Sequence, residues 1–276
     1  MKPYRRPIAC TVAGSDSGGG AGIQADLKTF HQFGVFGTSV LTAITAQNTL
    51  GVRAVHTVPL DVVTLQVEAL ATDLPPAAIK SGMLGSAELV DAVADAVERW
   101  SWRPLVVDPV MVATSGDRLL AEGAEQRIRE RLLPLATLVT PNRDEAMLLT
   151  GQAIDSPEDA ERAARTLVAM GAAAALVKGG HGPAPSETLV DVLFDGQRIH
   201  RFAHRRIPTR HTHGTGCTLS AAVTAGLAWG RALPEATEAA VAFVAQAIER
   251  APGLGAGSGP VDHFTPPPAW ASPLVR

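Results

Sequence analysis

Residues 8–26 decide the fold of this chain, and they read IACTVAGSDSGGGAGIQAD. The first six residues form a short apolar run, which predicts a buried strand over Ile8 to Ala13. Five glycines follow within residues 14–22, and a helix is predicted from Gln24 to Phe33, closed by Gly34. A strand, a glycine-rich turn and a helix in this order open a βαβ unit, which predicts a parallel sheet.

The rest of the chain repeats the alternation of short apolar runs and helical patterns. Further strands are predicted at Ala77 to Lys80, Pro104 to Val107, Thr137 to Val139 and Ala173 to Val177, with a hairpin of Thr188 to Phe194 and Arg198 to Phe202. Further helices are predicted at Val62 to Leu74, Ala87 to Trp100, Gly123 to Leu133, Pro157 to Met170 (with Ser156 as its N-cap), Thr215 to Trp229 and Pro234 to Arg250. We therefore expect an α/β fold: a single domain over residues 1–276, built as a three-layer α/β/α sandwich with a mostly parallel central sheet and an irregular, Gly- and Pro-rich tail at residues 252–276.

Composition narrows the classes of partner. Hydrophobic residues make up 46% of the chain and the formal net charge is −3, which supplies a large core and no basic field for nucleic acid. No apolar run approaches the roughly 18 residues that a membrane span needs. The two cysteines, Cys10 and Cys217, lie far apart in the sequence and favour a reducing compartment. We expect a cytoplasmic protein that binds neither nucleic acid nor membrane.

The glycine-rich turn of residues 14–22 is a predicted ligand site. Its glycines let the backbone approach a ligand closely, the helix that follows offers free N–H groups, and Asp16 and Asp26 lie beside it. Residues 20–25 formally match a dinucleotide pattern, but no acidic residue follows about 20 positions on to bind a ribose. The Gly-Lys-Ser/Thr ending of a P-loop is absent from the sequence.

A second glycine cluster, HGTGCT at residues 213–218, precedes the helix predicted from Thr215. Four consecutive backbone N–H groups at a helix start form an anion hole, which can stabilise the negative charge of a phosphoryl group during its transfer. Cys217 is either a reactive thiol whose pKa the helix start lowers, or a small buried thiol. Both interpretations stay open at this point.

Together, six motifs resemble the hydroxymethylpyrimidine/phosphomethylpyrimidine kinases of thiamine biosynthesis, within the ribokinase-like superfamily. They are GSDSGGGAGIQAD (14–26), AQNT (46–49), KSGML (80–84), DPVM (108–111), VKGGH (177–181) and HGTGCT (213–218). The resemblance spans Ile8 to about Phe264. It implies a ribokinase-like fold, ATP and Mg²⁺, a homodimer, and the phosphorylation of hydroxymethylpyrimidine and then of its monophosphate.

The resemblance implies a pyrimidine pocket between the first glycine loop and the corner at Gln47. Its implied substrate contacts are Gly14, Asp16, Ala21, Asp26, Gln47, Met83 and Val110. A carboxamide such as that of Gln47 matches the donor and acceptor pair on an aminopyrimidine edge. The alternative is that Gln47 is a polar strand end that bonds only to its own backbone.

For the nucleotide, the resemblance implies contacts from Asp108, Asn142, Lys178, Thr209, Gly214 and Gly216. It implies catalytic roles for Cys217, Gly214, Thr215, Gly216 and Lys178, and metal ligation by Asp108 and Glu145. Mg²⁺ prefers oxygen ligands and keeps several waters, so two acidic groups and the ATP phosphates suffice. Asn142 and Glu145 also have the spacing of a helix capping box, and Lys178 is alternatively a solvated strand-end lysine.

The chain departs from related patterns at two informative places. Sugar kinases of the superfamily carry Asp where this chain has Cys217, and a largely neutral thiol avoids repelling an acceptor that is already a phosphate monoester. Ser81 stands where the resemblance leads us to expect isoleucine. Residues 182–186 are expected to form a flexible flap.

Three other functions compete. A pyridoxal kinase performs the same reaction on another heteroaromatic alcohol, and it stops after one phosphoryl transfer. A non-catalytic ligand-binding homologue is disfavoured because the motifs at Asp108, Lys178 and 214–217 are intact. A dinucleotide oxidoreductase is the least favoured hypothesis, since the acidic residue that would bind the ribose of the dinucleotide is missing.

Overall fold

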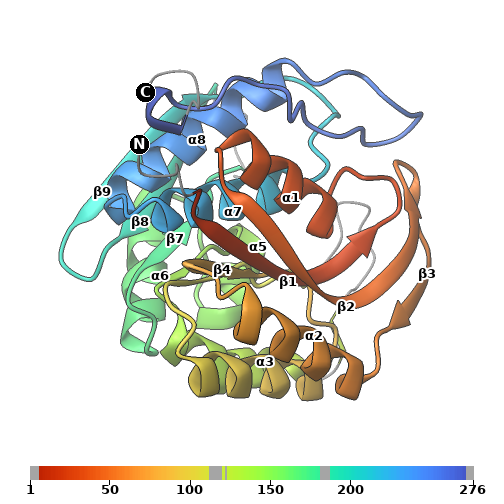
Figure 1. Cartoon of the computed structure of the whole chain (residues 1–276). Helices are drawn as coiled ribbons and strands as arrows, with labels where there is room; N and C mark the ends of the chain where they lie inside the picture. The colour runs from red at the N-terminus through yellow and green to blue at the C-terminus, as the bar shows by residue number, and fades with distance from the viewer. Residues whose placement is uncertain (1–5, 112–119, 122, 181–186, 272–276) are drawn as a thin grey trace, which may run out of the picture.

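One nine-stranded sheet runs through the described part of the chain, with the strand order β3-β2-β1-β4-β5-β6-β7-β8-β9 (Figure 1). The structure is a computed structural model of the whole chain and describes residues 6–111, 120–121, 123–180 and 187–271, so the expected flap at 182–186 lies outside the described residues. The strands are β1 (Ile8–Asp16), β2 (Phe36–Asn48), β3 (Gly51–Thr57), β4 (Ala78–Ser81), β5 (Leu105–Val107), β6 (Leu138–Val139), β7 (Ala175–Val177), β8 (Thr188–Phe194) and β9 (Ile199–Arg205). The six strands from β2 to β7 in this order are parallel to one another, while β3, β8 and β9 pair antiparallel.

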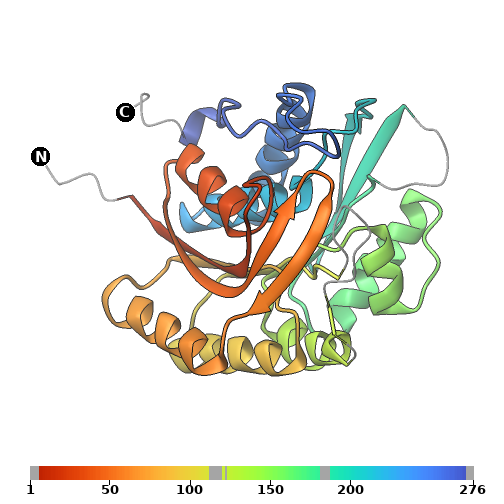
Figure 2. The same cartoon turned by 90° about the vertical axis from the view of Figure 1, so that its right-hand side faces the viewer.

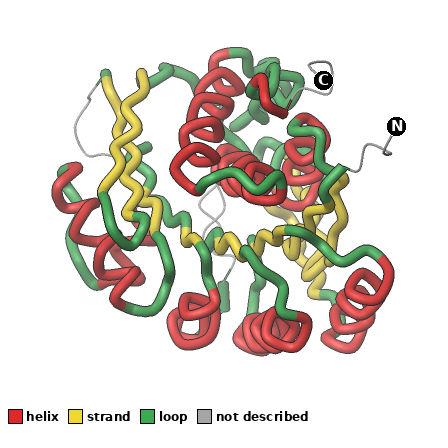
Figure 3. Tube along the Cα trace, turned by 60° about the vertical axis from the view of Figure 1, so that its left-hand side comes forward, coloured by secondary structure: helices red, strands yellow, loops and turns green. Residues whose placement is uncertain are grey.

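Helices cover both faces of this sheet (Figures 2 and 3). They are α1 (Gly22–Gln32), α2 (Leu60–Asp73), α3 (Ala87–Trp100), α4 (Ala124–Arg127), α5 (Arg143–Thr150), α6 (Pro157–Ala169), α7 (Thr215–Ala228) and α8 (Leu233–Glu249). One apolar cluster joins the sheet to α2, α3, α4, α5 and α6, and the second joins it to α1, α7 and α8. Strand β5 shows the alternation, because Leu105 and Val107 belong to the first cluster and Val106 to the second. The predicted three-layer α/β/α sandwich with a mostly parallel sheet is confirmed.

The carboxyl ends of the parallel strands meet at one edge of the sheet, and α1 follows β1 there. Helix α7 follows β9, which runs in the same direction as the parallel strands because two antiparallel pairings separate it from β7. The tail after α8 has no helix or strand from residue 252 to residue 268, apart from a bridge of Pro260 to His213. It returns to this edge, where the Ser258 N–H donates to the Thr49 carbonyl at 2.9 Å.

Several predicted boundaries need correction. Strand β1 continues past Ala13 to Asp16, and β9 continues past Phe202 to Arg205. The helix predicted over Gly123 to Leu133 is α-helical for only the four residues of α4 and continues as a π turn and a 3-10 turn up to Leu135. The predicted N-cap at Ser156 is confirmed, since its hydroxyl accepts from the Asp159 N–H at 3.2 Å. Among the described residues, no helix combines the length and the apolar character that crossing a bilayer requires.

Candidate active site

The carboxylate of Asp16 organises the first glycine loop. It lies at the end of β1, is 2% exposed, and accepts N–H groups from Gly18, Gly20 and Ala21 at 2.7 to 3.0 Å. Burial acts to raise the pKa of Asp16, but these amides and His213 outweigh it and hold the pKa below its usual value. Asp16 is therefore an anion that shapes the loop from within.

The two glycine clusters of the sequence meet at this loop. His213 Nε2 lies 2.9 Å from Asp16 Oδ2, although 197 positions separate the two residues. A Cβ atom on Gly214 would lie 1.8 Å from the Gly20 carbonyl oxygen, and one on Gly20 would lie 2.6 Å from His213 Cδ2. Such approaches are open only to glycine at both positions, and Gly214 also has φ +81°, a conformation that favours glycine. The start of α7 thus lies against the loop that opens α1.

The first turn of α7 presents backbone N–H groups, but fewer than the sequence suggested. The Thr215 N–H and hydroxyl both donate to the Thr212 carbonyl, and the Thr218 N–H donates to Gly214. The N–H groups of Gly216 and Cys217 make no hydrogen bond with any described residue, so they are the donors left for an anion.

Cys217 is partly exposed at this helix start. Burial raises the pKa of its thiol to about 11, and the nearby Lys80 ammonium offsets this only in part. Of the two interpretations that the sequence left open for Cys217, the raised pKa favours the buried thiol over the reactive one. Near neutral pH the side chain is an uncharged thiol.

A second set of charges lies on the other side of the α7 start. Lys178, which follows β7, places its Nζ 3.3 Å from Asp108 Oδ1, and a Cβ on Gly216 would lie 3.3 Å from the same Nζ. Asp108 follows β5, is 2% exposed, and accepts hydroxyl bonds from Thr140 and Ser220, each at 3.2 Å. Lys178 is thus bound rather than freely solvated, and it lies against the anion-binding turn.

Asn142 and Glu145 form the predicted capping box at the start of α5. The Asn142 side chain accepts from the Glu145 N–H at 2.9 Å, and the Glu145 carboxylate accepts from the Asn142 N–H at 2.7 Å. Burial raises the pKa of Glu145 to about 7, which Lys178 opposes and Asp108 reinforces. Two acidic groups therefore lie near one cation at this side of the site.

The residues predicted to bind the pyrimidine fall into two groups. Gln47, at the end of β2, accepts from the Thr45 hydroxyl at 3.1 Å and its backbone is tied to Ser17, so it borders the glycine loop. Met83 lies against Gly14, where a Cβ would be 3.2 Å from the sulfur. Asp26 differs, because it is fully buried and bonds to Lys80 and Thr11 instead of facing a pocket.

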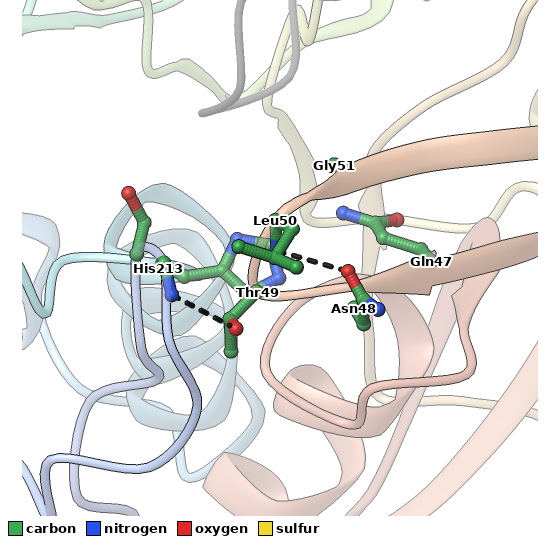
Figure 4. Close-up of a pocket in the computed structure, with 8 residues that line it drawn as sticks. Gln47, Asn48, Thr49, Leu50, Gly51 and His213 are labelled. Carbon is green, nitrogen blue, oxygen red and sulfur yellow. Dashed lines mark hydrogen bonds between the residues drawn. The ribbon is translucent and has the colours of Figure 1, made fainter.

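The described residues line two hollows. The first measures about 190 Å³ and lies between the turn that joins β2 to β3 and the C-terminal tail (Figure 4). It is lined by Gln47, Asn48, Thr49, Leu50, Gly51, His213, Gly257 and Ser258. The second measures about 330 Å³ and lies between α8 and the chain that leaves β9. It is lined by Arg205, Ile207, Pro208, Ala245, Gln246 and Glu249, and Thr209 follows it in the chain.

Sequence reasoning assigned no role to four residues that the structure places here. Lys80 is fully buried beside Asp26, His213 joins the two glycine clusters, and Thr140 and Ser220 bond to Asp108. A lysine at the end of an otherwise apolar strand was a usable signal for Lys80, because lysine is seldom buried without a partner. The two hydroxyls carry no such signal, since only the folded chain brings them to Asp108.

Comparisons with known proteins agree on one family. A family model described as phosphomethylpyrimidine kinase matches residues 16–262. A hydroxymethylpyrimidine/phosphomethylpyrimidine kinase of Rhizobium meliloti is 54% identical over 260 residues, covering 93% of this chain and 97% of the relative. A bifunctional thiamine biosynthesis protein of Geobacter sulfurreducens is 50% identical over 262 residues, covering 95% of this chain and 53% of that protein. Among solved structures, a pyridoxal kinase of Staphylococcus aureus in complex with ADP superposes with a TM-score of 0.88 at 38% identity, covering 95% of each chain.

Proposed function

Because the chain belongs to the phosphomethylpyrimidine kinase family, we propose that its two glycine clusters hold the two reactants of a phosphoryl transfer. The protein is a kinase that phosphorylates hydroxymethylpyrimidine and then the resulting monophosphate, for thiamine biosynthesis, with ATP as the donor. One observation carries the residue assignment: Gly214 touches Gly20, so an acceptor in the first loop lies beside the free amides of Gly216 and Cys217. The same contact joins a ring pocket to an anion site.

The acceptor ring lies between the first glycine loop and Gln47. Gly14 and Ala21 supply backbone without bulk, Met83 supplies an apolar wall beside Gly14, and Val110 follows Asp108. The Gln47 oxygen accepts from Thr45, which orients the carboxamide and leaves its NH₂ group for the ring nitrogen. Asp16 acts by holding the loop, and Asp26 acts through Lys80.

The donor phosphates lie over the first turn of α7. The Gly216 and Cys217 amides bind the γ-phosphoryl oxygens, and Lys178 neutralises their charge from the adjacent side. The acceptor oxygen forms a bond to the γ-phosphorus as the bond to the β,γ-bridging oxygen breaks, ADP leaves, and the hydroxyl proton passes to solvent. Thr209 connects this turn to the hollow beyond β9, whose volume of about 330 Å³ and apolar residues Ile207, Pro208 and Ala245 make it our candidate for the adenine ring.

The residues also fit a magnesium ion. Burial is the main cause of the raised pKa of Glu145, and the nearby Asp108 carboxylate adds to it, so a cation near the two carboxylates relieves their repulsion. Mg²⁺ prefers oxygen ligands and keeps several waters, so Asp108 and Glu145, with Asn142, water and the ATP phosphates, would suffice to hold it. Bound there, Mg²⁺ supplies charge neutralisation between the phosphates.

Cys217 stays neutral so that the site accepts a phosphate monoester. Its thiol has a pKa of about 11, and an aspartate in its place would face the phosphate of the second acceptor. Like charges at contact repel by about 1 to 4 kcal/mol, depending on the local dielectric. Cys217→Asp is expected to lose the second transfer more than the first, and equal loss of both contradicts this role.

The test is mass spectrometry of the products that the full chain makes from hydroxymethylpyrimidine and Mg-ATP. The monophosphate is expected first and the diphosphate second, each with one equivalent of ADP. Lys178→Met is expected to lower both rates at least tenfold, which corresponds to about 1.4 kcal/mol. ADP release without either phosphorylated product contradicts the proposal.

Pyridoxal is the second candidate acceptor, because the structural neighbour with a TM-score of 0.88 is a pyridoxal kinase. The same assay with pyridoxal separates the two, since one phosphoryl group is then the limit. We further propose a homodimer, and a cytoplasmic location in keeping with the unpaired thiols of Cys10 and Cys217.

A further inference from the structure

Lys80 and Asp26 form an ion pair with no exposure to solvent. Lys80 Nζ lies 2.8 and 3.0 Å from the two carboxylate oxygens of Asp26, and both side chains are 0% exposed. The Thr11 hydroxyl donates to the same carboxylate at 2.6 Å. Strands β1 and β4 and helix α1 are thereby joined directly beneath the glycine loop.

The ammonium group lies at the carboxyl edge of the sheet. Lys80 belongs to the end of β4 and pairs with Thr11 and Val106. A Cβ on Gly82 would lie 3.0 Å from Lys80 Nζ, so the side chain extends along its own strand toward the site. Glycine at position 82 leaves the room that this path needs.

Stability does not explain this pair. A buried ion pair loses the hydration of both ions, and apolar residues of similar volume often stabilise a fold equally well. Asp26 takes two of the three directions in which an ammonium donates, and no other described residue accepts from Lys80 Nζ. One N–H is therefore left without an acceptor among the described residues.

The pair lies beside α7. Helix α7 packs against β4, which carries Lys80, and against α1, which carries Asp26. Burial raises the pKa of the Cys217 thiol at the start of α7, and the Lys80 ammonium lowers it in part. Lys178 approaches the same turn from the side of Asp108. The first turn of α7 therefore has two ammonium groups near it, and the function proposed above gives only Lys178 a role toward a phosphate.

We propose that Lys80 is a positioning residue, a fixed cation beneath the acceptor that favours the acceptor carrying a phosphate. This inference rests on the proposed function, and it assigns the two lysines different partners. Lys178 serves the nucleotide phosphates in both transfers, whereas Lys80 matters most when a second phosphate enters beside Cys217. The charged side chains around this turn are Lys80 with its partner Asp26, and Lys178 with its partner Asp108.

The decisive variant is Lys80→Met combined with Asp26→Asn, which removes both charges and leaves no unpaired carboxylate. We expect kcat/KM for the monophosphate acceptor to fall at least tenfold more than kcat/KM for hydroxymethylpyrimidine, a difference of about 1.4 kcal/mol. Lys28→Met is the matched control. It removes the lysine of α1, whose Nζ bonds to the Gly19 carbonyl at the exposed side of the loop, and it is expected to leave the ratio unchanged.

The alkylation of Cys217, measured without substrate, tests the role of Lys80 independently of the proposed kinase activity. The rate of alkylation of Cys217 by iodoacetamide at fixed pH reports its thiolate fraction, with Cys217→Ala as the blank. In the double variant this rate is expected to fall by about tenfold, the change that one pKa unit produces. The buried thiol of Cys10, whose pKa is raised to about 12 by burial, contributes little to the rate.

Each outcome decides one claim. An unchanged alkylation rate, or equal loss of both transfers with wild-type alkylation, overturns the role of Lys80. Absence of the diphosphate from wild type overturns the proposed function, while the alkylation rate still decides the position of the cation. Should the double variant fail to fold, Lys80→Leu with Asp26→Leu removes the same charges with apolar residues and is measured in its place.

Discussion

The hydroxyl of Ser81 is buried in the sheet without a hydrogen-bond partner among the described residues. Ser81 is 1% exposed and pairs with Val12 and Val107, on the face that packs against α2 and α3. A buried hydroxyl left unbonded costs about 1 to 3 kcal/mol of stability. We expect Ser81→Ala to raise the free energy of unfolding by about 1 kcal/mol, measured by urea denaturation.

Ser220 is the matched control for this prediction. Its hydroxyl is also buried, but it donates to Asp108 at 3.2 Å and lies 3.0 Å from the Gly216 carbonyl. Ser220→Ala is therefore expected to lower the free energy of unfolding. A loss of stability in both variants contradicts the argument for Ser81.

At the scale of residues, the sequence predicted features that depend on near neighbours in the chain. It did not predict which side chains are buried or what burial does to their pKa. The caps at Ser156 and at Asn142 with Glu145 were predictable because capping depends on neighbours three positions apart. The pKa of Cys217 was not, since the depth of a thiol depends on elements distant in sequence. Asp26 and Lys80, 54 positions apart, are a second example of the same limit.

At the scale of elements, the contact of α7 with the first glycine loop permits a direct test. An added methyl group on Gly214 collides with the Gly20 carbonyl at 1.8 Å, and the φ of +81° adds strain. Gly214→Ala is expected to lower kcat/KM for both acceptors at least tenfold, about 1.4 kcal/mol, by moving the Gly216 and Cys217 amides. The measurement is the coupled assay for ADP release.

Gly151→Ala is the control that separates the strain of a positive φ from the steric collision at Gly214. It ends α5 with φ +71°, and nothing lies within 4 Å of an added Cβ. Gly151→Ala is expected to lower the free energy of unfolding by about 1 kcal/mol without loss of kcat/KM. Equal kinetic effects of the two substitutions would show that the contact with Gly20 is unimportant.

A pH-dependent ion pair between His204 and Asp191 links β9 to β8 in the hairpin. His204 Nε2 lies 3.3 Å from Asp191 Oδ2, and Asp191 Oδ1 accepts from the Gly179 N–H at 2.7 Å, next to Lys178. The bond to Asp191 raises the pKa of His204 above 6.5. A group whose pKa rises on folding stabilises the fold below its unfolded pKa, and the contribution is lost as pH rises through the folded pKa.

We therefore expect His204→Gln to be destabilised at pH 5.5 and close to wild type at pH 9. The loss at low pH is expected to be about 0.5 to 1 kcal/mol, as for other partly exposed pairs, and is measured by urea denaturation at each pH. His56→Gln, in exposed β3, is the control, because His56 forms no ion pair with any residue that the structure describes. A deficit that is the same at both pH values contradicts a charge-dependent anchor.

The elements themselves were unevenly predictable. Helix α3 and strand β8 have the bounds that were predicted: α3 has an amphipathic pattern after the cap at Ser86, and β8 is a mostly apolar run that ends at the Asp195-Gly196 turn. Strands β2 and β3 were missed. β2 mixes buried and exposed positions with polar residues at its end, and β3 is exposed along most of its length, so neither shows the apolar run of a buried strand.

At the scale of the whole molecule, the site depends on both ends of the chain. The loop after β1 supplies Asp16, α7 follows some 200 residues later, and the tail after α8 closes against Thr49 and His213. The His213 N–H donates to the Gly259 carbonyl at 3.0 Å, and the Gly257 N–H donates to the Thr49 hydroxyl at 3.3 Å. The sequence marked this tail as irregular, but its contacts follow only from the assembled sheet.

The apolar surface of the whole molecule is unevenly distributed. Ten large apolar side chains are exposed among the described residues, and seven of them lie within residues 36–65, on β2, on β3 and the turn before it, and on α2. They are Phe36, Ile44, Leu50, Val55, Leu60, Val62 and Leu65. β3 is also an edge strand, with backbone groups available for pairing. A second copy of the chain is the partner that covers such a region in a homo-oligomer.

We expect wild type to have twice the chain mass of 28.7 kDa in sedimentation equilibrium, and Val55→Asp with Leu65→Asp to sediment as a monomer. Both side chains are about half exposed or more (47% and 61%), so their replacement removes little packing within one chain and adds charge to the interface. Leu148→Asp is the control, because Leu148 is 45% exposed on α5, outside this region. A monomeric wild type, or a double variant that stays dimeric, excludes this region as the interface. Because the region is built on β2, whose end carries Gln47, a monomeric variant is also expected to show a raised KM for the acceptor with its kcat less affected.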